Sequence, residues 1–399
     1  MASRNEEHLQ RALRSIPWGT QTNAKRHERD GMRERPAFIE RAEGCRMWDL
    51  DGREFIDYRA ALGPIVLGYQ YAPVDAAVRR QMEKGILFSM ASPVEAEAAE
   101  AILATTGWPE QIRFMKTGAD ACACCLRLAR SRTGRDHFLS VGYHGYQDWF
   151  AMAWPNPGIP AALMPFVHEI AYGDAGALES VFAEHGSRLA AAVVVPLEWH
   201  LDPDPAFLKR LRELCDRHGA ALVFDEILTG FRMARDGAAG YFGITPDMAA
   251  YAKGMANGYP LSAFAGKREW MRTLEQTILT TTYAGETLSL AAACAVMEIY
   301  RREPVHEHLH RTGAALRKGF EEIFSETGFP ARTAGVDPGF VIDFSPAGEA
   351  AESLHPALFN ALYAAGIFAN EQWFVTYSHR ESDIDQTLQA MRNSIRKVL

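Results

Sequence analysis

The stretch Ala220-Ala221-Leu222-Val223-Phe224-Asp225-Glu226 decides the fold that this chain is expected to adopt. Its first five residues are apolar on both faces, as in a strand of a parallel sheet that is covered by helices. A carboxylate at the carboxyl end of such a strand points into the crevice where α/β sheets bind ligands. The sequence therefore predicts a mostly parallel α/β sheet with a ligand site beside Asp225.

A lysine follows this strand in a setting that favours chemistry. Lys253 stands between Ala252 and Gly254, 28 residues after Asp225, among apolar and glycine-rich residues. Loss of hydration lowers the pKa of an amine held in such surroundings. A basic lysine and a buried aspartate are the pair that pyridoxal 5′-phosphate requires, because the lysine forms the Schiff base and the aspartate keeps the pyridine nitrogen protonated. Taken alone, the same pattern also fits a solvated loop or an ion pair.

Composition limits the classes of function. The chain has 399 residues and a net charge of −8, so it has no basic excess with which to neutralise nucleic-acid phosphates. It begins with charged residues rather than an apolar signal segment, and no apolar run approaches the roughly 20 residues of a membrane helix. We expect a cytoplasmic protein with small-molecule partners and no nucleic-acid or membrane partner.

The six cysteines include Cys122 and Cys125, which form a CxxC pattern. No second cysteine or histidine pair stands at the spacing of zinc ligands, and both residues lie in an apolar run that is expected to be helical. We interpret them as small packing residues and expect no metal site.

The order of the patterns predicts two lobes. Residues 1–58 form an N-terminal segment with a small antiparallel sheet, in which Asp51-Gly52 is a hairpin turn. Residues 59–302 alternate strands with helices, as expected of a large cofactor-binding domain. Residues 303–399 alternate helices with fewer strands, as in a smaller α+β domain against which the N-terminal segment packs.

Two turns after strands offer further ligand-binding groups. Thr117-Gly118-Ala119 joins a strand to a helix, so its free backbone N–H groups and the helix dipole would hold an anion. Tyr143 stands beside glycines after a strand at residues 137–141 and could lie flat on a planar cofactor. Considered one at a time, an ordinary strand-to-helix turn and a core tyrosine fit the same residues.

Five motifs occur in one order: Thr117-Gly118-Ala119-Asp120-Ala121, Gly142-Tyr143-His144-Gly145, Phe224–Arg232, Ala252-Lys253-Gly254 and Thr282-Tyr283-Ala284-Gly285. This series resembles the class III aminotransferases, which have fold type I and depend on pyridoxal 5′-phosphate (PLP). Within them it is closest to the glutamate-1-semialdehyde 2,1-aminomutase subgroup. The resemblance extends from about Ile16 to Leu388 and implies a mostly parallel central sheet in a large domain plus a smaller α+β domain.

The resemblance implies a role for each matching residue. Lys253 would be the Schiff-base lysine and the proton shuttle, and Asp225 would pair with the pyridinium nitrogen. Tyr143 would stack on one face of the cofactor ring, and Ile227 would pack on the other. The remaining cofactor-binding residues would be Thr117, Gly118, Ala119, His144, Glu198 and Thr282. The family's threonine at the position of Thr282 reaches the phosphate across a subunit interface, which implies a homodimer with shared active sites.

Departures from the subgroup concern the substrate. Ungapped matching places Lys25, or Arg26 after a one-residue slip, where the aminomutases have an arginine that grips the substrate carboxylate. A lysine lacks the planar fork that binds a carboxylate through two hydrogen bonds. Leu62 replaces a pocket tryptophan, Glu286 adds a carboxylate after the interface threonine, and Glu371 matches a glutamate near the family's active site. We expect Lys25, Leu62, Glu286 and Glu371 to contact the substrate.

The sequence therefore predicts an aminotransferase that moves an amino group from an amino-acid donor to a polar keto or aldehyde acceptor, with ping-pong kinetics. The extra carboxylates would suit a cationic or hydroxylated acceptor, such as a precursor of an amino sugar, an aminoglycoside or another specialised metabolite. Three alternatives stay open: a glutamate-1-semialdehyde 2,1-aminomutase, a racemase or epimerase on the same fold, and a non-enzymatic protein that retains the fold. The intact pair of Lys253 and Asp225 argues against the last.

Overall fold

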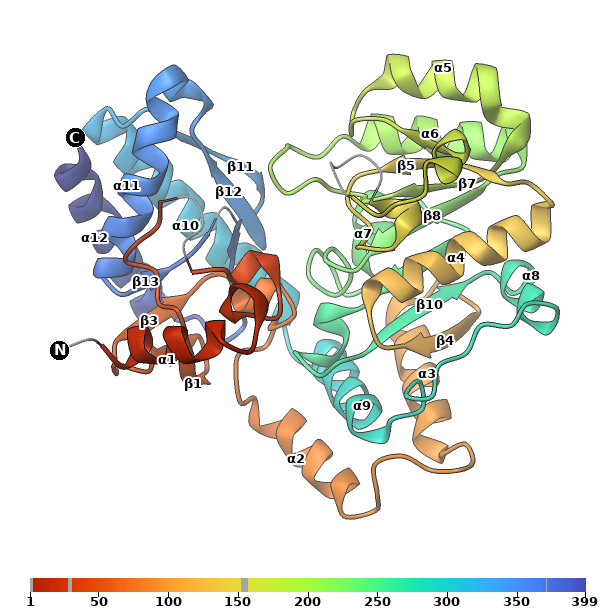
Figure 1. The fold of residues 1–399 in the computed structure, drawn as a ribbon, viewed down its shortest axis with the longest axis horizontal. Helices are drawn as coiled ribbons and strands as arrows, with labels where there is room; N and C mark the ends of the chain where they lie inside the picture. The colour runs from red at the N-terminus through yellow and green to blue at the C-terminus, as the bar shows by residue number, and fades with distance from the viewer. Residues whose placement is uncertain (1–2, 28–30, 152–156, 371) are drawn as a thin grey trace. The chain divides into compact units, whose positions relative to one another are not determined.

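The structure is a computed structural model that describes residues 3–27, 31–151, 157–370 and 372–399 (Figure 1). Its contacts divide the chain into two compact units. The first unit combines Met1–Tyr71 with Glu307–Leu399, and the second is Ala72–His306. None of the described helices has both the length and the apolar character that a membrane span needs.

The first unit extends to Tyr71, whereas the sequence placed a boundary after residue 58. Hydrogen bonds to the C-terminal part of the chain explain the difference. The Tyr377 N–H donates to the Val66 carbonyl at 2.8 Å, and the Ser378 hydroxyl donates to the Leu67 carbonyl at 2.6 Å. The segment after residue 58 therefore belongs with the C-terminal residues rather than with the large sheet.

The second unit is built on a seven-stranded sheet (Figure 1). From edge to edge its strands are β4 (Gln111–Met115), β10 (Ser262–Gly266), β9 (Met248–Tyr251), β8 (Ala221–Glu226), β7 (Leu189–Val194), β5 (His137–Val141) and β6 (Val167–Glu169). Strands β6, β5, β7, β8 and β9 run parallel, and β10 is antiparallel to both of its neighbours. The prediction of a mostly parallel central sheet is confirmed, and the apolar stretch that ends at Asp225 and Glu226 forms its middle strand, β8.

Helices bury both faces of this sheet, which is why β7 and β8 are buried along their whole length. Helix α4 packs on one face through Cys125 and Leu128, which belong to one apolar core with Phe138, Val193 and Val223 of the strands. The helices of this unit are α2 (Ala72–Met82), α3 (Pro93–Thr106), α4 (Gly118–Thr133), α5 (Ala175–His185), α6 (Pro205–His218), α7 (Gly237–Phe242), α8 (Arg268–Met271) and α9 (Thr287–Arg302). The result is a rigid sheet whose strand ends can position a site.

The first unit contains two small sheets. One has the order β1 (Ile39–Glu43), β2 (Arg46–Asp49), β3 (Glu54–Asp57) and β13 (Ile367–Phe368), and the other has the order β11 (Arg332–Val336), β12 (Gly339–Asp343) and β14 (Gln372–Phe374). Strand β13 pairs in parallel with β3, so one sheet combines the N-terminal and C-terminal parts of the chain. The helices are α1 (Arg4–Leu13), α10 (Val305–Thr327), α11 (Ala351–Ala364) and α12 (Glu381–Val398).

In the sequence, Ser382 and Asp385 resemble a capping box, but the last helix begins before Ser382. Helix α12 already includes Ser382, and its first turn is capped by Asp383, whose carboxylate accepts the Arg380 N–H at 2.9 Å. The same carboxylate accepts a hydrogen bond from Arg46 at 2.5 Å. Asp383 rather than Ser382 caps the helix, because its carboxylate both satisfies a free helix N–H group and neutralises an arginine.

Candidate active site

The loops that follow β5, β8 and β9 leave the sheet at one edge, because these strands are parallel. Asp225 is the next-to-last residue of β8, His144 follows β5, and Lys253 follows β9. The carboxyl edge of a parallel sheet is where α/β proteins bind their ligands. The topology thus brings together three residues that are far apart in the sequence.

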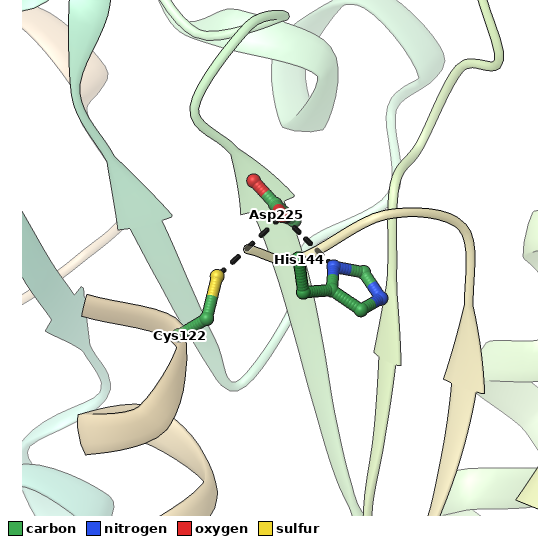
Figure 2. Close-up of side chains that lie close together, drawn as sticks. All are labelled: Cys122, His144 and Asp225. Carbon is green, nitrogen blue, oxygen red and sulfur yellow. Dashed lines mark hydrogen bonds and ion pairs between the residues drawn. The ribbon is translucent and has the colours of Figure 1, made fainter. Parts of the chain in front are cut away.

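The Asp225 carboxylate is buried and held by three donors, and Figure 2 shows the Cys122 and His144 side chains among them. Its Oδ2 atom accepts from His144 Nδ1 at 2.8 Å and from Cys122 Sγ at 3.5 Å, and its Oδ1 atom accepts from the Ile227 N–H at 3.0 Å. Burial, together with the negative charge of Asp225, raises the pKa of the Cys122 thiol well above its ordinary value, so the thiol keeps its proton. Because a carboxylate only accepts, His144 carries its proton on Nδ1.

The other ring nitrogen of His144 is also buried. Among the described residues, no group forms a hydrogen bond with His144 Nε2. Buried polar atoms in proteins almost always have a partner, which can be a ligand or an ordered water. Nε2 lies two bonds from Nδ1, the His144 atom that donates to Asp225. We therefore expect a bound group or an ordered water beside Nε2.

Lys253 is held in a strained conformation. It begins a short 3₁₀ turn, Lys253–Ala256, with a φ angle of 42°, in the left-handed region that residues other than glycine rarely adopt. Burial lowers its pKa to about 8, the buried Arg232 guanidinium acts in the same direction, and Asp225 opposes them. The lowered pKa predicted from the sequence is thus present. Backbone strain of this kind clusters at functional sites.

The N-terminus of α4 offers backbone donors. Thr117 caps this helix: its hydroxyl accepts the Asp120 N–H at 3.2 Å and donates to the Asp120 carboxylate at 2.7 Å. The next residues, Gly118 and Ala119, carry N–H groups that by helix geometry have no partner within the helix. A Cβ atom at Gly118 would lie 2.5 Å from Ile227 Cδ1, so only glycine lets Ile227 pack here. Thr117 caps the helix, and the backbone N–H groups of Gly118 and Ala119 are candidates for binding an anion.

Tyr143 lies in the turn after β5, and Glu198, which follows β7, approaches the same turn. Tyr143 is 60% exposed in the isolated chain. Its partial burial and, to a smaller extent, the negative charge of Asp225 raise the pKa of its hydroxyl. Glu198 supports this turn, because a Cβ atom at Gly142 would lie 2.6 Å from Glu198 Oε1. Burial raises the pKa of Glu198. The exposed ring of Tyr143 offers a face on which a planar group could stack.

Glu286 is engaged inside the chain. Its carboxylate accepts from Lys116 Nζ at 2.9 Å, from the Ser289 hydroxyl at 2.6 Å and from the Leu288 N–H at 2.6 Å, so it caps α9. Burial alone would raise its pKa, but the hydrogen bonds from Ser289 and Lys116 lower it. These partners use most of the acceptor positions of the carboxylate, and the contact of Glu286 with a substrate stays a prediction. Thr282 is exposed in the loop before α9, and Glu371 lies outside the described residues.

Lys25 and Leu62 line a cavity of about 390 Å³ in the unit that contains the N-terminus. Leu62 ends a turn in which Ala60, Ala61 and Leu62 all have positive φ angles, of 47°, 54° and 75°. A left-handed turn of three non-glycine residues costs roughly 1–2 kcal/mol per residue. Strain of this size persists only where the surroundings impose it, and it marks the wall of the cavity as a functional candidate.

Residues 29–394 match the family model of the class III aminotransferases. The chain belongs to the class III aminotransferases. A glutamate-1-semialdehyde 2,1-aminomutase from Thermomicrobium roseum is 35% identical over 395 residues, which cover 92% of this chain and 92% of the relative. The solved structure of the PLP internal aldimine form of the Sphingopyxis sp. FumI protein is 30% identical, with a TM-score of 0.92 over 99% of this chain and 96% of that one. An omega-transaminase from Sphaerobacter thermophilus, 24% identical, shares the fold with a TM-score of 0.93 over 100% of this chain and 98% of that one.

Class III aminotransferases depend on pyridoxal 5′-phosphate, which is therefore the cofactor of this chain. The residues present fit it. The site has a buried carboxylate for a ring nitrogen, a lysine with a lowered pKa, a helix N-terminus for a phosphate and the orphaned Nε2 atom of His144. The donor atoms of Cys122, His144 and Asp225 lie within 4.8 Å of one another, close enough to share a metal ion. Because the class III aminotransferases depend on pyridoxal 5′-phosphate, we assign this group of residues to the cofactor site.

Sequence reasoning missed two residues of this site. Cys122 was interpreted as a packing residue; it is buried, as expected, but its thiol also donates to Asp225. Its position four residues after Gly118, on the same face of α4, is the signal that could have found it. Arg232 was quoted only as part of a motif, yet its buried charge acts on the pKa of Lys253.

Proposed function

We propose that this class III aminotransferase transfers an amino group to a substrate other than glutamate-1-semialdehyde. The proposal is supported chiefly by Lys25 and Leu62. They replace the arginine and the tryptophan of the aminomutases, and both line the 390 Å³ cavity. A lysine binds a carboxylate as a point charge rather than through a planar fork, and a leucine removes an aromatic wall.

The site residues would divide the work between positioning and proton transfer. Pyridoxal phosphate supplies, when bound, a ring that accepts electrons. Lys253, with a pKa of about 8, has a sizeable neutral fraction near neutral pH and would take the proton from the substrate Cα and return it. Asp225 would hold a negative charge against the ring nitrogen. Tyr143 and Ile227 would cover the two ring faces, while the first N–H groups of α4 would hold the phosphate.

The lining of the cavity points to the substrate class. Most of its side chains are apolar, and its cationic members include Lys25, Arg35 and Arg59. The acidic lining residue, Asp57, is already occupied, because it accepts the Tyr69 hydroxyl at 2.7 Å. An apolar cavity with an excess of positive charge suits a carboxylate or another anionic group on an apolar body. An anionic, partly apolar keto acid or aldehyde is therefore a better candidate than a cationic amino-sugar precursor.

We also propose a homodimer with shared sites. The end of α2 and the loop between α2 and α3 expose the apolar side chains of Met82, Ile86, Leu87, Phe88 and Met90. Thr287 ties this loop to the segment that carries the exposed Thr282, because its N–H donates to the Ile86 carbonyl at 2.9 Å. A contiguous apolar patch of this kind is unusual on a monomer, and a second copy would cover it. Sedimentation of the holoenzyme should give a dimer, and a monomer would contradict this proposal.

A substrate panel tests the proposed reaction. Purified holoenzyme would receive glutamate or alanine as donor and, as acceptors, glutamate-1-semialdehyde, keto sugars and carboxylated apolar ketones or aldehydes, with the amine product measured by mass spectrometry. We expect transfer to the last group. In the variant Lys25→Arg/Leu62→Trp, turnover should move toward glutamate-1-semialdehyde, whereas Lys318→Arg, at an exposed position of α10, should change nothing. Turnover of glutamate-1-semialdehyde alone, without a donor, would refute the proposal.

The second candidate is the aminomutase reaction, which is favoured by the name of the relative from Thermomicrobium roseum. It predicts rearrangement of glutamate-1-semialdehyde without any external donor, so the same panel separates the two functions. A racemase or epimerase would use Lys253 as well. It predicts uptake of deuterium at Cα from heavy water without transfer of the amino group.

A further inference from the structure

The second turn of α4 contacts Asp225. Cys122 is fully buried, and its Sγ atom lies 3.5 Å from Asp225 Oδ2, within the range of a hydrogen bond to sulfur. Figure 2 shows Cys122 on its helix and His144 on the loop after β5, approaching the carboxylate from different sides. The other carboxylate oxygen points away from both side chains.

The hydrogen-bond capacity of Asp225 explains what this contact does. An ionised carboxylate can accept about four hydrogen bonds, two at each oxygen. Among the described residues, Cys122 and His144 fill both positions of Oδ2, and the Ile227 N–H fills one position of Oδ1. One acceptor position, on Oδ1, is left for a further donor.

We propose that Cys122 is a positioning residue that orients Asp225 so that Oδ1 receives the ring nitrogen of the cofactor. This rests on the proposed role of Asp225. The thiol is a neutral donor, so it closes a position on Oδ2 without adding a charge beside the ring. Without it, Oδ2 would offer a competing acceptor, and the carboxylate could rotate.

The position of Cys122 links both ends of the cofactor site. Gly118 and Ala119, at the N-terminus of α4, carry the N–H groups proposed for the phosphate. Cys122 follows about one turn later, or roughly 5.4 Å along the helix axis. One rigid helix would therefore set both the phosphate anchor and the orientation of the carboxylate that holds the ring nitrogen.

The test compares Cys122→Ala with Cys122→Ser, which keeps a donor, and with Cys125→Ala. Cys125 is equally buried on the same helix, and in the described part of the chain its thiol makes no hydrogen bond to Asp225. The readouts are the dissociation constant of pyridoxal phosphate and the pH midpoint of its absorbance change in the holoenzyme. We expect Cys122→Ala to weaken cofactor binding about fivefold, as for loss of one hydrogen bond, and to move the midpoint. The dissociation constant of Cys122→Ser should stay within about twofold of the wild-type value, and that of Cys125→Ala should equal the wild-type value.

Equal behaviour of Cys122→Ala and Cys125→Ala in both readouts would overturn the inference and leave Cys122 as a packing residue. If Cys122→Ala does not fold, Cys122→Val, which also lacks a donor but fills the space, carries the same prediction. Asp225→Ala separates this inference from the proposed function. If Asp225→Ala releases the cofactor while Cys122→Ala does not change cofactor binding, only the role of Cys122 fails. If Asp225→Ala has no effect on cofactor binding, the proposed roles of Asp225 and of Cys122 both fail.

Discussion

Replacing Lys253 by methionine should stabilise the cofactor-free protein near neutral pH. Burial lowers the pKa of Lys253 from an ordinary 10.5 to about 8. The charged form of this lysine is therefore less stable in the folded protein than in the unfolded chain. This difference corresponds to about 3 kcal/mol. Methionine has a similar length and no charge, so Lys253→Met removes this cost while it keeps most of the packing.

The sign of the effect depends on pH. Below about pH 8 both states bind the proton, and the folded state pays the full cost of the buried ammonium group. Between about 8 and 10.5 the unfolded chain still binds a proton that the folded protein has released, so the stability of the wild type rises with pH. Above 10.5 both states are neutral, and the advantage of Lys253→Met should disappear.

Urea unfolding of the cofactor-free wild type and of Lys253→Met, at pH 7 and at pH 10.5, measures this difference. The variant should be more stable by about 3 kcal/mol at pH 7 and nearly equal to the wild type at pH 10.5. Lys209→Met, at an exposed position of α6, should show a difference from the wild type that does not depend on pH. A variant that is no more stable at pH 7, or a difference that stays constant with pH, would refute the reasoning.

Three further changes test other parts of the structure. Asp225→Ala should weaken binding of pyridoxal phosphate at least tenfold in an equilibrium titration, because the ring nitrogen loses its charged partner; unchanged affinity would contradict its role. Ala61→Gly should raise the free energy of unfolding by about 1 kcal/mol, since glycine adopts its φ angle of 54° without strain, and a lower melting temperature would argue against strain there. Glu286→Ala should cost about 1 kcal/mol in thermal unfolding through loss of the α9 cap, with no change in acceptor range; a changed range would return Glu286 to the substrate site.

The large unit was well predicted because its signals are local. The apolar run that ends at Asp225 and the regular alternation of strands and helices identify a parallel sheet, and the ends of parallel strands meet at one edge. This is enough to bring Asp225, His144 and the loop of Lys253 together. The family relationship then supplies the cofactor. Cytoplasmic location and the lack of a nucleic-acid partner stay predictions.

The sequence did not indicate hydrogen bonds between side chains that are distant along the chain. The ion pair of Glu286 with Lys116, 170 positions earlier, leaves no local signal. Cys122 is buried as predicted, but its hydrogen bond to Asp225 was missed because the acceptor lies on β8, 103 positions later. Composition indicates that a residue is polar or small, but only the packed structure shows whether its hydrogen bonds are already used.

The most direct test of the central claim is the identity of the lysine that carries the cofactor. Borohydride reduction of the holoenzyme, followed by peptide mapping with mass spectrometry, fixes the pyridoxyl group where it is attached. We predict that the label lies on Lys253 and that Lys253→Met shows none. A label on another lysine, such as Lys116, or an unlabelled wild-type protein after loading with pyridoxal phosphate, would contradict the account.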